Sequence, residues 1–245
     1  MKRELAMGIN SVEGLIRHAP ERVVRVWLRR GNARLVALAE QLAALGVPVE
    51  YADDRALDRL SGEVRHQGVV AEFRPRQPLD EHGLKALLEA AEEAPLLLVL
   101  DGVQDPHNLG ACLRTAAAAG ALAVIVPRDR AAGLTPTARR AAAGAAERVP
   151  LVQVTNLARC LAELAEQGIW CLGLAGEADS SLYQARLDGP LALVLGSEER
   201  GLRRLTRERC DQLVSIPMAS GIDSLNVSVA AGVSLFEVRR LKRCS

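Results

Sequence analysis

The chain of 245 residues is poor in aromatic side chains, with only two Trp, two Tyr and two Phe. So few rings argue against an extended platform for stacking nucleic-acid bases. Cysteines are few as well: five are scattered along the chain and none forms a CxxC pair. We therefore expect neither a disulfide framework nor a zinc knuckle, but buried or incidental thiols in a reducing, cytoplasmic protein.

Long hydrophobic runs are missing, since no segment approaches the ~20 apolar residues that a bilayer-spanning helix needs. The stretch from Met1 to Pro20 lacks the apolar region of a signal peptide. Without such a run, we expect no membrane partner. No loop places Cys or His at metal-ligand spacing, so we expect no bound metal either. GxGxxG and Walker loops do not occur at the ends of the predicted strands, which argues against NAD enzymes and NTPases.

Neither sign of charge is in excess: the sequence has 31 Lys and Arg and 30 Asp and Glu, which gives a formal net charge of +1. The basic residues are nearly all Arg, with only three Lys. Residues 1–34 hold eight Lys or Arg against three acids, and residues 200–243 hold nine against four. Guanidinium forks suit phosphate oxygens, so an RNA partner fits this distribution. Solvated arginines that reflect genome composition fit it equally well, and the Arg-rich stretch 200–209 is open to both interpretations.

We expect a small N-terminal α/β domain over residues 1–73, a linker over 74–82 and a larger domain over 83–245. In the first domain, β-branched and alternating residues predict strands at 23–28, 47–51 and 69–73, with a helix over 34–45. The linker begins with Pro75 and Pro78, which break both helix and sheet.

The larger domain alternates strands with helices. Short apolar runs predict strands at 96–100, 123–126, 151–154, 169–174, 191–195 and 213–216. Helices are expected at about 83–93, after Thr135 as an N-cap, and over 157–166 with Asn156 as the N-cap. This alternation predicts an α/β fold with a mostly parallel sheet covered on both faces. Such sheets bind ligands beyond the carboxyl ends of their strands.

Three loops that follow predicted strands are too specialised to be simple connectors: residues 101–110, 196–202 and 217–226. They share glycines, which let a backbone approach a ligand closely, and a few polar side chains in or near them: Asn108, Arg114, Glu198, Ser224 and Asn226. Backbone-lined loops suit a cofactor that contains a nucleoside, while one Arg and one Glu suit a held phosphate and an oriented hydroxyl. Taken singly, His107 is typical of a solvated loop residue, and Asp223 and Ser224 are typical helix caps.

The three loops lie within long motifs. DGVQDPHNLGACLRTAAAAG, LALVLGSEERGL and IPMASGIDSLNVSVAAGVSLFE closely resemble the three ordered motifs of the SpoU (TrmH) RNA 2'-O-ribose methyltransferases. AAAGAAERVPLVQVTNL resembles the segment between the first two, and the resemblance covers about residues 95–240. MGINSVEGLI and HQGVVAEF resemble the small substrate-binding domain of the family's ribosomal branch, which is similar to ribosomal protein L30e.

The resemblance implies a SPOUT-type α/β fold, in which the parallel sheet ends in a C-terminal deep trefoil knot, preceded by an L30e-like domain. It also implies a homodimer with the C-terminal helix in the interface, and S-adenosyl-L-methionine as the cofactor bound in the knot. Matching positions assign backbone contacts with the cofactor to Gly196, Ile216 and Leu225. Three further residues line the same pocket in this interpretation: Leu195, Met218 and Ser224.

The implied activity is methylation of a ribose 2'-hydroxyl in RNA, with a guanosine of 23S rRNA as the target in the ribosomal branch. Arg114 matches an arginine of the family that is proposed to promote removal of the proton from the 2'-hydroxyl. Because a guanidinium stays protonated at neutral pH, we expect it to clamp a phosphate and stabilise the developing alkoxide. Glu198 or water then takes the proton, or Glu198 holds its loop in place. Asn108 and Asn226 orient Arg114, the ribose or the loops.

Other functions remain open at this point. One is methylation of tRNA or of another rRNA site, and another is a non-catalytic RNA-binding protein with the same fold. The set of polar residues argues against a binding protein, because such a protein needs no glycine-rich cofactor loop. A nucleotide-dependent α/β enzyme of another kind is the last alternative.

Overall fold

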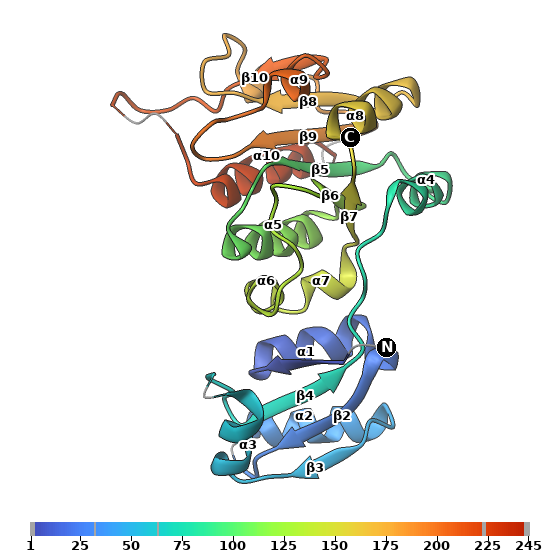
Figure 1. Ribbon diagram of the computed structural model, residues 1–245, viewed down its shortest axis with the longest axis vertical. Helices are drawn as coiled ribbons and strands as arrows, with labels where there is room; N and C mark the ends of the chain where they lie inside the picture. Colours follow the sequence, from blue (N-terminus) through green and yellow to red (C-terminus); the bar gives the residue numbers. More distant parts are fainter. Residues whose placement is uncertain (1–2, 32, 63, 222–223, 243–245) are drawn as a thin grey trace.

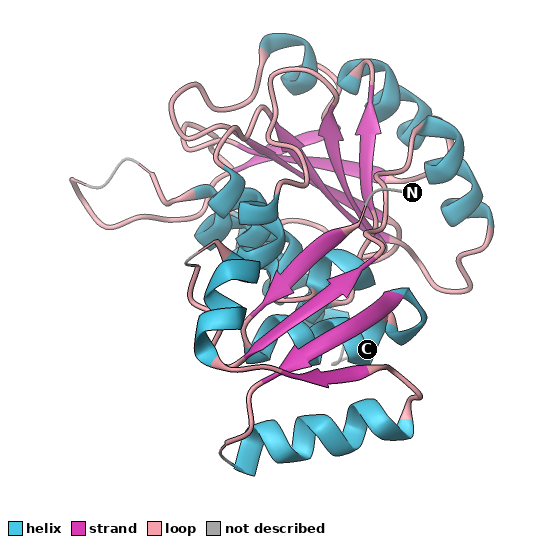
Figure 2. Ribbon diagram, turned by 60° about the horizontal axis from the view of Figure 1, so that its bottom comes forward, coloured by secondary structure: helices cyan, strands magenta, loops and turns pink. Residues whose placement is uncertain are grey.

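The computed structural model describes residues 3–31, 33–62, 64–221 and 224–242. Within these residues the backbone forms two separate β-sheets, which Figure 1 shows in the lower and upper parts of the molecule. The N-terminal part of the chain forms a four-stranded sheet and the remainder forms a six-stranded sheet. Helices pack against both sheets (Figure 2).

The four-stranded sheet has the order β1-β4-β2-β3, in which β4 runs antiparallel to both neighbours and β2 runs parallel to β3. Apolar residues of two helices, α1 and α2, pack with β2 and β4 in one buried cluster. The elements are β1 (Glu4–Met7), α1 (Ile9–His18), η1 (Pro20–Arg22), β2 (Val23–Leu28), α2 (Ala33–Ala44), β3 (Val49–Tyr51), α3 (Asp54–Ser61) and β4 (Val69–Phe73).

The strands predicted at 23–28 and 69–73 are confirmed, and the helix predicted over 34–45 begins and ends one residue earlier. The strand predicted over 47–51 is shorter, because β3 pairs with β2 only from Val49 to Tyr51. The sequence does not predict β1, since four residues are too few to show a clear alternation. Pairing with β4 along the whole of β1 supplies its backbone hydrogen bonds.

The six-stranded sheet has the order β10-β8-β9-β5-β6-β7, and every pairing in it is parallel. All of β5 and all of β9 except its last residue are buried, as their continuous apolar sequences predict. The predicted α/β fold with a parallel sheet is confirmed, while the trefoil knot stays a prediction. The strands are β5 (Leu96–Asp101), β6 (Ala123–Pro127), β7 (Leu151–Val154), β8 (Trp170–Leu174), β9 (Leu191–Gly196) and β10 (Gln212–Val214).

Helices cover both faces of this sheet and form a separate buried cluster on each. One face carries α5 (Pro106–Ala119), α6 (Pro136–Ala142), α7 (Ala145–Arg148) and α10 (Val227–Lys242). The other carries α4 (Glu81–Glu89) and α8 (Leu157–Glu166). The predicted N-caps are confirmed: Thr135 accepts from the Ala138 N–H at 3.2 Å, and Asn156 accepts from the Arg159 N–H at 3.0 Å. Two short helices, η2 (Leu182–Gln184) and α9 (Arg204–Arg207), precede β9 and β10.

The segment between β4 and α4 is held against the second sheet. Leu79 exchanges two backbone hydrogen bonds with β7, each with an N···O distance of 2.8 Å. A second set of contacts involves Arg139 of α6, which forms ion pairs with Glu4 of β1, at 3.0 Å, and with the buried Glu147 of α7. These contacts between the N-terminal and C-terminal parts of the chain fix the two sheets relative to each other.

Among the described residues, no helix is long and apolar enough to cross a membrane. Within the same ranges, no group of three or more His, Cys, Asp or Glu side chains is arranged to hold a metal ion.

Candidate active site

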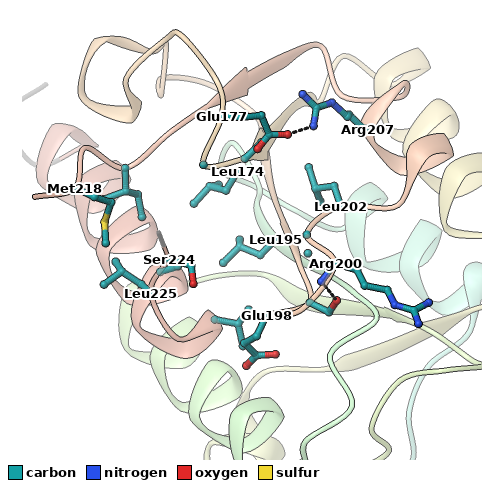
Figure 3. Close-up of a pocket in the computed structure, with 18 residues that line it drawn as sticks. Leu174, Glu177, Leu195, Glu198, Arg200, Leu202, Arg207, Met218, Ser224 and Leu225 are labelled. Atoms are coloured by element: carbon teal, nitrogen blue, oxygen red, sulfur yellow. Dashed lines mark hydrogen bonds and ion pairs between the residues drawn. The ribbon is translucent and has the colours of Figure 1, made fainter. Parts of the chain in front are cut away.

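A cavity of about 430 Å³ opens beyond the carboxyl ends of β8 and β9 (Figure 3). This is the edge at which parallel sheets bind ligands. The end of β9 supplies one part of the lining, and the segment between β10 and α10 supplies another. All six residues that the sequence assigned to the cofactor lie in these two parts: Leu195, Gly196, Ile216, Met218, Ser224 and Leu225.

A tight turn after β9 forms one wall of the cavity. Ser197 and Gly201 exchange backbone hydrogen bonds, with N···O distances of 3.2 and 2.9 Å. Gly196 packs directly against this turn, because a Cβ on Gly196 would lie 2.0 Å from the carbonyl carbon of Gly201. No larger residue fits at Gly196, so its backbone forms part of the cavity wall.

The cavity has apolar walls and a charged rim. Leu174, Leu195 and Leu225 are among its apolar lining residues, and at the rim Glu177 forms an ion pair with Arg207 (Figure 3). The hydrogen bond from the Arg207 guanidinium lowers the pKa of the Glu177 carboxyl. Apolar walls suit a nucleobase, and backbone carbonyls with a carboxylate suit ribose hydroxyls and an amino group. The residues present therefore fit the S-adenosylmethionine that the motifs imply.

Sequence reasoning did not select Glu177 or Arg207. Glu177 lies three residues beyond Leu174, the last residue of β8. The rule that selected the other loops, polar side chains just after a predicted strand, could have found it. Arg207 carries no such signal, because it belongs to an Arg-rich stretch whose members look alike in sequence.

Side chains from the three loops meet in one hydrogen-bonded chain. Asn108 donates from Nδ2 to Glu198 Oε1 at 2.5 Å, and Asn226 donates from Nδ2 to Asn108 Oδ1 at 3.1 Å. Glu198 also lines the cavity. Three of the four side chains that the sequence assigned to catalysis, one from each loop, are thus in contact at the edge of the cavity.

Arg114 does not belong to this network of hydrogen-bonded side chains. It is exposed on α5, and its side chain has no hydrogen bond or ion pair with any part of the chain that the structure describes. It is also absent from the lining of the cavity. Its guanidinium is therefore available to an anionic ligand on the surface of α5.

The start of α10 is capped by Asn226. Its Oδ1 accepts from the backbone N–H of Ser228 at 2.9 Å and from the Ser228 hydroxyl at 2.6 Å. Ser224 is exposed and lines the cavity instead of acting as a cap. The other predicted cap, Asp223, lies outside the described residues. His107 is exposed at the start of α5, in agreement with its interpretation as a solvated loop residue.

Two protein families and many curated relatives match this chain. Residues 95–236 match the SpoU rRNA Methylase family, and residues 5–79 match the family described as RNA 2'-O ribose methyltransferase substrate binding. The chain is 55% identical over 239 residues to "23S rRNA (guanosine-2'-O-)-methyltransferase RlmB" of Pseudomonas aeruginosa, covering 97% of this chain and 96% of that protein. It is 51% identical over 244 residues to the protein of the same name from Shewanella oneidensis, covering 99% of each.

Solved structures agree with these matches. The SpoU methyltransferase AviRb from Streptomyces viridochromogenes, in complex with the cofactor AdoMet, is similar with a TM-score of 0.79 and 25% identity, covering 99% of this chain and 92% of that one. An RNA 2'-O ribose methyltransferase is similar with a TM-score of 0.78 and 27% identity, covering 98% and 89%. Since the family match spans more than half of the residues and the relatives span nearly all of them, the chain belongs to the SpoU rRNA methylase family.

Proposed function

We propose that this protein transfers the methyl group of S-adenosylmethionine to the 2'-hydroxyl of a guanosine in 23S rRNA. Membership of the SpoU family and the two relatives named for this reaction support the proposal. The observation that carries it is the hydrogen-bonded chain from Glu198 through Asn108 to Asn226. This chain sets a carboxylate at the edge of a cavity that fits the cofactor.

Bound S-adenosylmethionine supplies a methyl group on a positively charged sulfur, ready for transfer to an oxygen nucleophile. Backbone groups at Gly196, Ile216 and Leu225 hold the cofactor, and three side chains cover it: Leu195, Met218 and Ser224. All of them line the cavity. Alignment of two bound reactants can contribute roughly 7–11 kcal/mol to lowering a barrier. The turn at 197–201, which two backbone hydrogen bonds between Ser197 and Gly201 close, serves this alignment.

Two polar side chains act at the reacting nucleotide, and two others position the loops. Arg114 holds an RNA phosphate and stabilises negative charge on the 2'-oxygen, which suits a guanidinium without a partner in the described chain. Glu198 takes the hydroxyl proton, directly or through water. Asn108 and Asn226 hold Glu198 and the three loops in place through their hydrogen bonds.

Substrate recognition belongs to residues 1–73, with a linker over 74–82 and catalysis in residues 83–245. The match of residues 5–79 to a substrate-binding family supports this division, as does the separate N-terminal sheet. With ribosomal RNA as its substrate, the protein acts in the cytoplasm.

The protein acts as a homodimer through α10. Val229 and Phe236 are seven residues apart on this helix, so they lie on the same face, and each is 49% exposed. Val233, between them, is only partly buried. An apolar stripe of this kind on a surface helix is typical of an interface, and a second copy of α10 is the occupant that we propose.

The test is transfer of labelled methyl from S-adenosylmethionine to an unmodified 23S rRNA transcript, with a tRNA transcript as the control and nuclease mapping of the product. Label in a single alkali-resistant dinucleotide that contains guanosine supports the proposal. Label only in tRNA contradicts the ribosomal assignment, and binding of cofactor without any transfer contradicts the catalytic one. Arg114→Ala should lower turnover with cofactor binding intact, and near-normal turnover would contradict its assigned role.

A further inference from the structure

A second cavity, of about 510 Å³, lies over the other half of the same sheet edge. It opens beyond the carboxyl ends of β6 and β7, and its lining includes Pro127 and Thr155. The loop after β9 divides the two cavities: Arg200, Gly201 and Leu202 line the first, and residues 203–206 line the second. The two cavities are therefore neighbours on one face of the molecule.

Basic side chains dominate the second cavity. Arg130, Arg203 and Arg204 line it, against a single acidic lining residue, Asp129, and Arg204 also forms an ion pair with Glu208 at 2.6 Å. Arg203 is held in place by Asp101, which is buried at the end of β5 and accepts from the Arg203 backbone N–H at 2.8 Å and from Nε at 2.5 Å. The Arg203 side chain is nevertheless 43% exposed, so its fixed guanidinium is reachable from the cavity.

Arg130 is the most unusual of the three arginines. Its backbone has a φ of 59°, in the left-handed region that residues other than glycine rarely adopt. Its side chain has no hydrogen bond or ion pair within the described ranges. The Ala132 N–H donates to Val103 at 2.8 Å, which ties the Arg130 loop to the loop that carries Asn108. Strained backbone of this kind concentrates at functional sites.

We propose that the second cavity binds a backbone phosphate of the substrate RNA, next to the nucleotide that is methylated. The inference rests on the proposed function, because it requires an RNA substrate. An RNA strand that presents its ribose at Glu198 needs a path over the neighbouring surface for the rest of its backbone. The second cavity lies across a single loop from Glu198, and guanidinium forks match phosphate oxygens in both charge and shape.

The experiment compares Arg130→Gln and Arg204→Gln with the wild-type protein on the 23S rRNA transcript. For each variant we expect the KM for RNA to rise about ten-fold, as for loss of one charge-assisted contact. The kcat at saturating RNA and the Kd for S-adenosylmethionine should stay within about two-fold, since neither residue lines the first cavity. The slope of log Kd for RNA against log salt concentration should become shallower by about one. Arg203 is left unchanged because it also holds Asp101.

Arg159→Gln is the matched control. Arg159 lies on α8 next to Ala158, which lines the second cavity, and like Arg204 it is ion-paired, but it does not line the cavity itself. An unchanged KM and salt slope in this control, with both changed in the two cavity variants, supports the proposal. Equal effects in all three variants would show a long-range effect of net charge and overturn it. So would an unchanged KM and slope in both cavity variants. Failure of the wild-type protein to methylate RNA is seen before any variant is made, and it contradicts the proposed function itself.

Discussion

Asn108 donates a hydrogen bond to Glu198 and accepts one from Asn226, so one amide joins the loops that follow β5, β9 and β10. An amide suits this position because it can donate and accept at once, which neither an aspartate nor a lysine side chain can do at neutral pH. The same geometry gives Glu198 two separable functions. Its shape joins the loops after β5 and β9, and its charge suits the proposed role of proton acceptor.

Glu198→Gln separates these functions. The Gln oxygen still accepts from Asn108, so the loops stay joined, but the proton acceptor is lost. We expect kcat for methyl transfer to fall by about 10²-fold, within the usual range for loss of a general base. Single-turnover methyl transfer to the 23S rRNA transcript, with cofactor binding measured by calorimetry, checks this. Normal turnover with normal cofactor binding would assign Glu198 to loop positioning alone.

Burial raises the pKa of the thiols of Cys112, Cys160, Cys171 and Cys210, each to about 12. An unfolded thiol titrates near 8.5, so at pH 8 a far smaller fraction of each native thiol than of an unfolded thiol is ionised and reactive. Because the folded pKa is the higher one, the neutral thiols favour the folded state below about pH 8.5. This contribution declines as pH rises from there toward 12.

Thiol labelling tests the prediction in a Cys244→Ser background, since Cys244 lies outside the described residues. Native protein at pH 8 should react slowly with a disulfide reagent, and protein in denaturant should react at four thiols at once. Fast reaction of any native thiol at pH 8 would contradict its burial.

Strands and helix caps were the parts of the fold that the sequence predicted best. Continuous apolar runs located β5 and β9 because a strand buried on both faces has no polar position. Thr135 and Asn156 marked helix starts because their side chains satisfy backbone N–H groups locally. By contrast, β1 owes its existence to pairing with β4, whose residues lie more than sixty positions away in sequence. Local patterns carry no signal for such a strand.

The apolar stripe on α10 leads to a testable prediction about the proposed homodimer. Phe236→Asp places a charge in the proposed interface, where burial without a partner is costly. We expect the dimer Kd to rise by at least about 100-fold, measured by sedimentation equilibrium. Val36→Asp is the matched control, because Val36 is 51% exposed on α2 of the N-terminal unit and lies outside the proposed interface. A monomeric wild-type protein, or a dimer that Phe236→Asp leaves intact, would contradict the use of α10.

The positions of the candidate loops could be predicted from the sequence, because each follows a strand of a parallel sheet and such strands end at one edge. The packing of the N-terminal unit against the C-terminal unit could not be predicted in this way. Glu4 and Arg139 are 135 positions apart, yet they form an ion pair beside the buried Glu147. In the sequence each is one charged residue among many. Only the folded backbones bring them together, so the packing of the N-terminal unit is a property of the complete tertiary structure.

Two glycines, Gly14 and Gly144, lie at a close approach between the N-terminal and C-terminal units. A Cβ on Gly14 of α1 would lie 2.5 Å from the carbonyl oxygen of Ala143 and 3.0 Å from the Cα of Gly144. Gly14→Ala gains about 0.5–1 kcal/mol of helix propensity, but the overpacked contact costs about 1–3 kcal/mol. Because the backbone atoms that it meets cannot move aside like a flexible side chain, we expect the contact to dominate and the units to loosen.

Limited trypsin digestion reports this loosening at the segment that joins the units. The Arg76 N–H donates to Glu147 at 3.1 Å and the Arg76 carbonyl accepts from Arg139 at 2.8 Å, so trypsin meets a fixed backbone there in the wild-type protein. Gly14→Ala should free this backbone and speed cleavage after Arg76 by about ten-fold, since cleavage follows the population of the open form. In the control Gly133→Ala the added Cβ meets nothing within 4 Å, and the wild-type digestion rate should persist. If Gly14→Ala also digests at the wild-type rate, the contact of Gly14 with Ala143 and Gly144 does not hold the two units together.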